Sequence, residues 1–556
     1  MKKSNRITGG ESLVKTLLSH HVDKAFGVAG ESYLAVLDAL YDAPDICFIT
    51  NRQEGGAGFM AESYAKLTEK TGICFVTRGP GATNAAIAVH TAMQDSTPMI
   101  LFVGQVATSH LGREAFQEID YEEMFKPPIA KAVFQINKAE EISDTVSHAF
   151  ALTQSGRKGP VVIALPEDIL TQEISSPDTT DKKNFTSIFP PATDIQRAKE
   201  MLQKAKKPIM IVGGSGWNDK DLKDFTDFAE THNIPVATSF RRQDLFPHHH
   251  PSYVGELGTG ANPEMVDLIR DEADLVIAVN TRLSEITSQG YTLISQENSR
   301  QKFIHIYPDQ NEFSKVYNAD LNILASPTGF IEKLKLMAGN FDFSDWRSQL
   351  NKVYQQWTTL EKTTSEFNVD MDLIFEYIRN HIPNNAIITT DAGNFSGWAQ
   401  RYIYYGRPVR LLAPTSGAMG YGLPSAISAS LSAPGQKVIG MMGDGGFMMT
   451  AQELSTAVAY QAKPIILLFN NGIYGTIRMH QARDYPQRKI GTELCNPDFS
   501  KLAGSYGIEH YKIEKTGDFY PVFRKALDGD QMILIEICYS PEQISTTRRL
   551  SDLENK

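Results

Sequence analysis

The stretch that decides the fold is VIGMMGDGGFMMTAQELSTAVAYQAKPIILLFNNGIYG, residues 438–475. Two apolar runs of strand length each end in a small side chain that carries oxygen, Asp444 after the first run and Asn471 after the second. One helix, expected roughly from Thr450 to Tyr460, separates them. A right-handed crossover of this kind places two parallel strands in one sheet, adjacent or nearly so. The stretch therefore predicts a βαβ unit with both polar residues at the carboxyl edge, where such sheets bind ligands.

These two polar residues suit a metal ion. Adjacent strands lie ~4.8 Å apart, so Asp444 and Asn471 are placed to share one hard cation. A set of carboxylate, amide and carbonyl oxygens suits Mg²⁺ or Ca²⁺ completed by phosphate oxygens. The neighbouring glycines let the backbone approach a phosphate and direct N–H groups at it. Asp-Gly or Asn-Gly alone is an ordinary turn, but the pair at this spacing indicates a diphosphate held through a divalent ion.

The same alternation of apolar runs and helical patterns recurs along the 556-residue chain. Short apolar runs such as GICFVTRG, residues 72–79, are typical of strands buried on both faces of a parallel sheet. The pattern predicts an α/β protein of three doubly wound domains, at 1–175, 190–340 and 365–545. The polar, proline-containing segment 175–194 is the expected linker between the first two.

Two segments of the first and third domains follow one plan. ICFVTRGPGATNAAIAVHTAM (73–93) and VIGMMGDGGFMMTAQELSTAV (438–458) each read as a strand, a glycine-rich turn and a helix of small residues. This similarity predicts that the first and third domains are structural relatives.

The composition narrows the class of partner. The net charge is −11, and the sequence contains no long basic run, so nucleic acid and anionic membrane surfaces are not expected partners. The N-terminal segment resembles an amphipathic helix rather than a signal peptide. The four cysteines are scattered without a CxxC pair, which favours a reduced, cytoplasmic protein without a disulfide framework.

Gly-Asp-Gly at 443–445, followed by Asn-Asn at 470–471, resembles the signature of thiamine-diphosphate-dependent enzymes. From about residue 5 to 545 the chain is similar to the acetolactate synthase and pyruvate decarboxylase superfamily. The resemblance implies thiamine diphosphate and Mg²⁺ as cofactors, with the metal bound by Asp444, Asn471 and the carbonyl of Ile473. It implies cofactor contacts at Gly30, Glu54, Asn84, Ala392, Gly393, Asn394, Phe395, Gly417, Met419, Gly443, Asp444, Gly445, Gly446, Asn471, Ile473, Tyr474 and Gly475.

The resemblance also implies catalytic roles. Met419 would force the cofactor into its bent shape. Glu54, in ICFITNRQEGGAGFMAESYAKL (46–67), follows a buried-type strand and precedes a helix of small residues. An apolar setting favours the protonated form of a carboxyl group, so Glu54 is expected to exchange a proton with N1′ of the pyrimidine ring. In the family the first and third domains of one site come from different subunits, which implies a homodimer or homotetramer.

Two further residues are expected near the substrate. In GVAGESYLAVLDAL (27–40), Glu31 stands where acetolactate synthases commonly have glycine. It is either an acid/base near the reacting carbon or a glutamate favoured by the dipole of the following helix. Gln117, in REAFQEIDYEEMFKPPIAKAV (113–133), matches the synthase pattern and would hydrogen-bond the intermediate.

The chain departs from an ordinary acetolactate synthase in two places. The segment 475–491 lacks the tryptophan that shapes the acceptor pocket in the family. Ile286 replaces the arginine that binds the acceptor carboxylate, unless Arg241, Arg242 or Arg478 takes over that role. The loop PIMIVGGSGW (208–217) resembles a dinucleotide loop without GxGxxG spacing, so the sequence leaves FAD open.

The sequence therefore predicts a thiamine-diphosphate- and Mg²⁺-dependent enzyme that acts on a small 2-oxo acid by decarboxylation and carboligation, like acetolactate synthase. A simple 2-oxo acid decarboxylase or an acyl-CoA lyase of the same superfamily is the alternative. Outside this class, the chain would be a non-catalytic relative that binds the cofactor.

Overall fold

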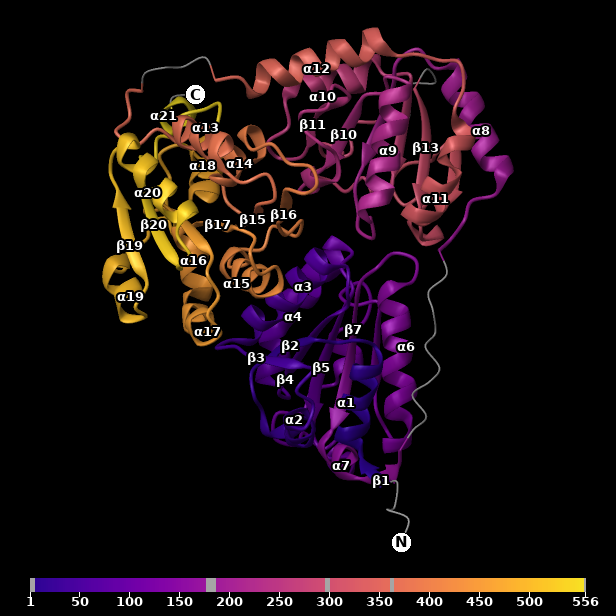
Figure 1. The fold of residues 1–556 in the computed structure, drawn as a ribbon, viewed down its shortest axis with the longest axis vertical. Coiled ribbons are helices and arrows are strands. Elements are labelled where there is room, and N and C mark those ends of the chain that lie inside the picture. Colours follow the sequence, from indigo (N-terminus) through magenta and orange to yellow (C-terminus); the bar gives the residue numbers. More distant parts are fainter. Residues whose placement is uncertain (1–5, 177–186, 296–300, 361–364, 555–556) are drawn as a thin grey trace. The chain divides into compact units, whose positions relative to one another are not determined.

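The computed structural model describes residues 6–176, 187–295, 301–360 and 365–554 (Figure 1). Residues 177–186 of the expected linker lie outside the described part. The chain forms two compact units. Unit 1 comprises 1–186, 414–434 and 448–463, and unit 2 comprises 187–413, 435–447 and 464–556.

Unit 1 contains a sheet of six parallel strands. In sheet order they are β3 (Cys47–Thr50), β2 (Lys24–Gly27), β4 (Gly72–Val76), β5 (Met99–Gln105), β7 (Pro160–Pro166) and β6 (Ala132–Gln135). The helices of residues 6–176 are α1 (Gly9–Ser19), α2 (Leu34–Tyr41), α3 (Glu54–Thr68), α4 (Pro80–Asp95), α5 (Tyr121–Met124), α6 (Ile142–Gln154) and α7 (Glu167–Thr171). The short strands β1 (Arg6–Thr8) and β8 (Glu173–Ser175) pair antiparallel. Strands β4, β5 and β7 are buried along their whole length, as their apolar sequences predict.

Two helices that come late in the chain complete unit 1. They are α15 (Gly422–Ser432) and α17 (Leu454–Ala459). At the start of α15 the Tyr421 ring packs edge-on against Phe59 of α3, with ring centroids 5.4 Å apart. The Ser428 hydroxyl donates to the carbonyl of Met60, also on α3. Residues from the last third of the sequence therefore cover a helix from the first.

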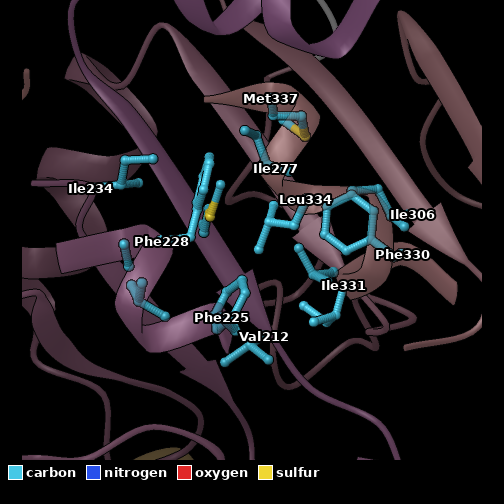
Figure 2. Close-up of a cluster of buried hydrophobic side chains, with 14 of the residues drawn as sticks. Val212, Phe225, Phe228, Ile234, Ile277, Ile306, Phe330, Ile331, Leu334 and Met337 are labelled. Atoms are coloured by element: carbon cyan, nitrogen blue, oxygen red, sulfur yellow. The ribbon is translucent and has the colours of Figure 1, made fainter. Parts of the chain in front are cut away.

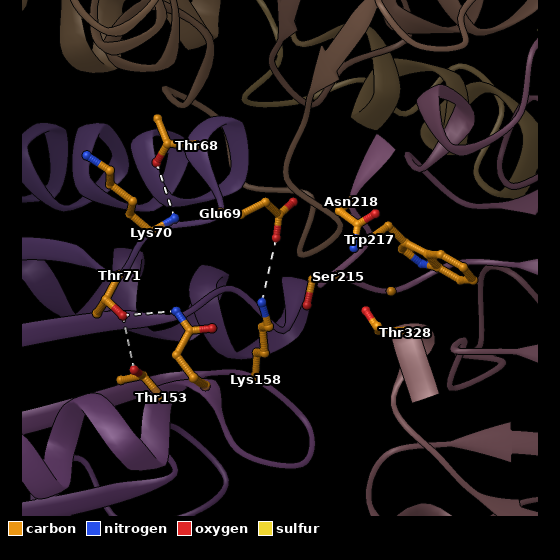
Figure 3. Close-up of polar contacts among 12 residues, drawn as sticks. Thr68, Glu69, Lys70, Thr71, Thr153, Lys158, Ser215, Trp217, Asn218 and Thr328 are labelled. Atoms are coloured by element: carbon orange, nitrogen blue, oxygen red, sulfur yellow. Dashed lines mark hydrogen bonds and ion pairs between the residues drawn. The ribbon is translucent and has the colours of Figure 1, made fainter. Parts of the chain in front are cut away.

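Side chains fix the end of α3 against α6 and the loop that follows α6. Glu69 caps α3 in a left-handed conformation and forms an ion pair with Lys158 at 3.6 Å (Figure 3). The Thr71 hydroxyl hydrogen-bonds that of Thr153 at 3.3 Å. These contacts hold the turn before β4 and thereby set the position of the strand that leads to the glycine-rich turn at 79–81.

The middle sheet of unit 2 also has six parallel strands. In sheet order they are β11 (Tyr253–Leu257), β10 (Val236–Ser239), β9 (Pro208–Val212), β12 (Leu275–Val279), β13 (Lys302–Tyr307) and β14 (Leu321–Leu324). Its helices are α8 (Ala192–Lys204), α9 (Asp219–Thr231), α10 (Pro263–Glu272), α11 (Pro327–Leu334) and α12 (Ser344–Thr358). Phe225 and Phe228 of α9 and Phe330 of α11 pack with Val212 and Ile277 of the sheet in one buried cluster (Figure 2).

The third sheet contains the stretch 438–475. In sheet order its parallel strands are β16 (Arg410–Leu412), β15 (Ile387–Thr390), β17 (Val438–Gly443), β18 (Ile465–Asn470), β20 (Ile533–Cys538) and β19 (Glu509–Ile513). Its helices are α13 (Met371–His381), α14 (Ser396–Tyr402), α16 (Asp444–Thr450), α18 (Gly475–Asp484), α19 (Phe499–Ser505), α20 (Thr516–Asp528) and α21 (Leu550–Glu554).

The predicted βαβ unit is confirmed, but its helical connection begins earlier than the sequence predicts. Strands β17 and β18 are adjacent and parallel, with Gly443 opposite Phe469. The expected helix from Thr450 to Tyr460 is confirmed in part: α17 lies within it, but α16 begins already at Asp444, and a 3₁₀ turn at Ala451–Glu453 separates the two helices. Asp444 lies in the first turn of α16, where the helix dipole favours a carboxylate, so the glycines after it belong to a helix rather than to a turn.

The first and third sheets share one strand order. Numbered along the chain within each domain, both run 2-1-3-4-6-5, whereas the middle sheet runs 3-2-1-4-5-6. The predicted kinship of the first and third domains is therefore confirmed at the level of topology. In the described part of the chain, no helix has the length and apolarity needed to span a bilayer.

Candidate active site

Asp444 is the centre of the candidate metal site in unit 2. It follows β17 directly, and its side chain is buried, with the residue only 2 % exposed. Its Oδ2 accepts from the backbone N–H of Gly472 at 2.9 Å and from the Asn496 amide at 2.7 Å. Burial raises the pKa of the Asp444 carboxyl group. Among the described residues no lysine or arginine forms an ion pair with it, so the site has a buried acid without a countercharge.

Asn471 lies beside Asp444 in a fixed orientation. Its Nδ2 donates to the hydroxyl of Tyr539 at 2.9 Å, which directs Oδ1 the other way. In the described part of the chain, Oδ1 accepts one long hydrogen bond, 3.2 Å, from the N–H of Ile473. A carboxylate and an amide oxygen therefore flank Gly472, and the Ile473 carbonyl follows in the same loop. This donor set suits a hard divalent cation.

Sequence reasoning missed Asn496, which supports this site. Asn496 donates to Asp444 and, at 3.1 Å, to Oδ1 of Asn470. Asn470 in turn donates to Glu536 at 2.7 Å. Asn496 lies in an irregular loop with no motif around it, so only the folded chain reveals its role. Partners of this kind orient the ligands of a metal.

The predicted diphosphate segments surround the same edge of the third sheet. Ala392, Gly393 and Asn394 follow β15, which is adjacent to β17. The amide of Asn394 is bound at both ends: Nδ2 donates to the Ile544 carbonyl and Oδ1 accepts from Thr476, each at 2.8 Å. Contacts of this segment with a ligand would therefore come from the backbone.

The aromatic residues of these segments are packed into the protein. Phe395 stacks on Phe469, with ring centroids 5.3 Å apart. A Cβ at Gly445 would lie 2.5 Å from Cε1 of Tyr474, so only glycine fits there. Gly446 and Gly475 lie in the first turns of α16 and α18. The backbone is thus held close at the point where the predicted diphosphate would lie.

Glu54, the expected proton-exchanging acid, starts α3 in unit 1. It is half-buried, and its Oε2 accepts from the Asn84 amide of α4 at 2.9 Å. A Cβ at Gly81 would lie 3.5 Å from its Oε1. The structure therefore brings the predicted residues Glu54 and Asn84 together beside the glycine-rich turn.

Glu453 holds the loop before Glu54 and was not found from the sequence. Its Oε1 accepts from the N–H groups of Arg52 and Gln53, and its Oε2 from the Asn51 amide, at 3.0 to 3.1 Å. Burial raises the pKa of Glu453. A residue of the 438–475 stretch thus fixes the position of the loop that carries Glu54.

The predicted pyrimidine-binding loop also belongs to unit 1. Gly417 has a positive φ of 71°, and Met419 is half-buried. The loop is anchored by Ser416, whose hydroxyl bonds Thr91 of α4 at 3.0 Å, and by Thr415, whose N–H donates to Asp95 at 2.8 Å.

Glu31 and Gln117 lie at the carboxyl edge of the first sheet. Glu31 starts a 3₁₀ turn and pairs with Arg78 at 2.8 Å. A Cβ at Gly79 would lie 2.9 Å from the Cβ of Gln117, so Gln117 packs against the residue after Arg78. A Cβ at Gly30 would lie 2.5 Å from that of Thr77. Arg78 was not singled out from the sequence, although it joins these predicted residues.

The three arginines considered as replacements for the absent acceptor ligand are all bound within unit 2. Arg241 donates to the Asp391 carbonyl at 3.2 Å, Arg242 donates through Nε to the Gly214 carbonyl at 2.6 Å, and Arg478 donates to Thr492 at 2.8 Å. The side chain of Asn280 donates to the Gly213 carbonyl at 3.2 Å. The chain's own side chains therefore already bind carbonyls of the loop considered for FAD.

Comparison with known families and proteins agrees with this geometry. Three models of thiamine pyrophosphate enzymes match the chain: the N-terminal TPP binding domain at residues 7–124, the central domain at 195–334 and the C-terminal TPP binding domain at 391–537. The probable acetolactate synthase large subunit of Methanococcus aeolicus is 33% identical, over 96% of this chain and 92% of its own length. The acetolactate synthase isozyme 3 large subunit of Escherichia coli is 29% identical, over 96% and 94%.

Proposed function

Since the chain belongs to the thiamine-diphosphate-dependent enzymes, and within them resembles acetolactate synthase large subunits, we propose that it uses Mg²⁺ and decarboxylates a 2-oxo acid, then joins the remaining acyl group to a second carbonyl compound. The observation that supports this most is Asp444, a buried carboxylate beside the Asn471 amide that has no lysine or arginine partner among the described residues.

The residues of the third sheet fit the metal and the diphosphate. Asp444, Asn471 and the Ile473 carbonyl would bind Mg²⁺, which supplies the positive charge that the buried carboxylate lacks. Asn496 and Tyr539 would hold these ligands in orientation. Thiamine diphosphate, when bound, supplies a nucleophilic carbon and an electron sink for the decarboxylation.

Glu54 would hold and transfer the proton at N1′ of the pyrimidine. Asn84 binds Oε2 of Glu54, which leaves Oε1 for this exchange. Glu453 keeps the preceding loop in place through two backbone N–H groups. The half-buried Met419 and the backbone of Gly417 would hold the pyrimidine ring.

We further propose that the enzyme is a cytoplasmic homodimer or homotetramer. The support is the resemblance to the family, in which the first and third domains of one site come from different subunits.

The test is to incubate the purified protein with thiamine diphosphate, Mg²⁺ and pyruvate, while CO₂ release and acetolactate formation are followed together. Release of CO₂ with a C–C-coupled product supports the proposal, and acetaldehyde as the sole product would mean a simple decarboxylase. Lack of CO₂ release from pyruvate and from a panel of longer 2-oxo acids would refute it. Glu54→Gln is the control for release that does not depend on the site.

A further inference from the structure

A cluster of three charged residues lies at the carboxyl edge of the first sheet. We define it as the Arg78 cluster, made of Arg78, Glu31 and Glu167. The Arg78 guanidinium group donates to Glu31 at 2.8 Å through one terminal nitrogen and to Glu167 at 3.0 Å through the other. Its side chain is 9% exposed, whereas those of Glu31 and Glu167 are 70% and 41% exposed.

The topology places this cluster where a ligand is expected. Glu31 follows β2 and Arg78 follows β4, and the strand order 2-1-3-4-6-5 reverses between these two strands. Doubly wound sheets bind their ligands at such a switch point, outside the carboxyl ends of the strands. Glu54 approaches the same edge, because both its Oε1 and the Thr77 side chain lie within 3.5 Å of the Cβ position of Gly81.

The cluster has a fixed position. The backbone N–H of Arg78 donates to the Ser32 hydroxyl at 3.3 Å, and that hydroxyl bonds Thr77 at 2.9 Å. The next N–H, of Gly79, donates to the Tyr121 hydroxyl at 2.8 Å. The cation of the cluster is therefore buried on an anchored backbone, and its two carboxylates face outward.

The charges of the cluster sum to −1, one guanidinium against two carboxylates, and the outward groups are the acidic ones. The two outward carboxylates of the Arg78 cluster repel a ligand whose own carboxylate stays close to them. This repulsion acts differently on the two substrates of the proposed reaction. The carboxylate of the donor 2-oxo acid leaves as neutral CO₂, whereas the carboxylate of a 2-oxo acid acceptor would remain in the product.

We infer that the Arg78 cluster selects an uncharged carbonyl compound, such as an aldehyde, as the acceptor and disfavours a second 2-oxo acid. This inference rests on the proposed function, since it presumes a carboligation. The balanced step takes pyruvate, one proton and an aldehyde to a 2-hydroxy ketone and CO₂. The bond from the pyruvate carboxylate to the carbonyl carbon breaks, a bond to the aldehyde carbon forms, and the aldehyde oxygen takes the proton.

The test is a competition between acceptors in the full-length protein with thiamine diphosphate and Mg²⁺. Pyruvate serves as donor and as charged acceptor, which gives acetolactate, while propionaldehyde is the uncharged acceptor, which gives 3-hydroxypentan-2-one. Prompt NMR of the mixture measures the ratio of the two products, and CO₂ release measures the donor step. The wild-type protein is expected to form mostly the hydroxypentanone.

Removing one charge from the cluster should shift this ratio. Glu31→Gln is expected to raise the share of acetolactate about five- to tenfold, the effect of one unit charge at contact range in a largely solvated site. Glu167→Gln should act in the same direction, more weakly. Glu140→Gln, at an exposed glutamate before α6, is the matched control and should leave the ratio unchanged.

The two possible failures are distinguishable. Normal CO₂ release with a product ratio that is the same in wild type, Glu31→Gln and Glu167→Gln would overturn the inference and leave the proposed function standing. Acetolactate as the main wild-type product would also overturn it. Lack of CO₂ release from any 2-oxo acid would refute the proposed function and the inference together.

Discussion

Among the described residues, the Glu54 side chain has one hydrogen-bond partner, the amide of Asn84. The proton exchange expected of Glu54 can therefore be tested separately from cofactor binding. Glutamine at position 54 preserves the shape of the side chain but cannot exchange a proton. We expect Glu54→Gln to lower turnover by about 10² or more, the usual effect of losing a positioned acid or base. Calorimetry should show thiamine diphosphate bound nearly as tightly as in the wild type, and full activity in this variant would contradict the role of Glu54.

Asp444 should behave in the opposite way. Alanine at position 444 removes the charged oxygen of the metal site, so we expect cofactor affinity to fall in the presence of Mg²⁺. Changes in residues that only orient metal ligands cost about 10- to 100-fold in affinity. Asn496→Ala should fall within that range, and Asp444→Ala should exceed it. Titration of each variant with thiamine diphosphate, with and without Mg²⁺, measures both, and unchanged affinity in Asp444→Ala would refute the metal site.

The residues found from the sequence and those missed differ in a physical way. Asp444, Asn471, Glu54 and Asn84 stand next to strand ends or glycine-rich turns, where local sequence carries a signal. Asn496 and Glu453 act over 52 and 401 residues of separation, on Asp444 and Arg52. Long-range partners of this kind have no local pattern and depend on the packing of the whole unit, so they appear only once the chain is folded.

At the scale of elements, the turn between β10 and β11 contains a buried histidine. The His248 ring stacks on Tyr253 with centroids 4.0 Å apart, meets Tyr405 edge-on, and lies 3.2 Å from the Gln243 carbonyl through Nε2. Burial lowers the pKa of His248 to about 3, assisted by His249 and opposed by the Gln243 carbonyl and Asp244. The folded protein therefore keeps this imidazole neutral at a pH where the unfolded chain protonates it.

This difference gives the stability a defined pH dependence. Between about pH 6.5 and 3 the unfolded state binds the His248 proton and the folded state does not, so stability falls as pH falls, by about 1.4 kcal/mol per pH unit from this group. We expect His248→Phe to make the loss of stability between pH 6.5 and 4.5 less steep. Urea unfolding at several pH values tests this, with His90→Phe at an exposed position as the control. Equal slopes in both variants would contradict the prediction.

The third sheet shows which features of the fold the local sequence predicts and which it does not. The adjacency of β17 and β18 was predicted correctly because their apolar runs and the helix-length connection leave few topologies. The start of α16 was not predicted, because Gly445 and Gly446 are residues typical of turns and yet lie within the helix here. The Tyr474 ring lies so close to position 445 that only glycine fits there. Gly445 is therefore needed for packing and does not indicate a turn.

At the scale of the whole molecule, the proposed sharing of sites between subunits can be tested by mixing two inactive variants. In a mixed dimer of Glu54→Gln and Asp444→Ala, one site would carry both changes and the other neither. We therefore expect co-refolded or co-expressed variants to regain about a quarter of the wild-type activity, since half of the dimers are mixed and half of their sites are intact. Sites built within one chain would give no recovery.

The architecture also has a consequence for the order in which the chain is made. The cover of α3 is supplied by Tyr421 and Ser428, which a ribosome adds about 250 residues after β8 ends at Ser175. At about 5–20 residues per second, roughly ten to fifty seconds pass between the two events. During this interval the nascent first domain exposes the surface of α3 around Phe59 and Met60. We therefore expect chaperones to bind the newly synthesised chain at this stage. Release is expected once α15 has been synthesised and covers α3.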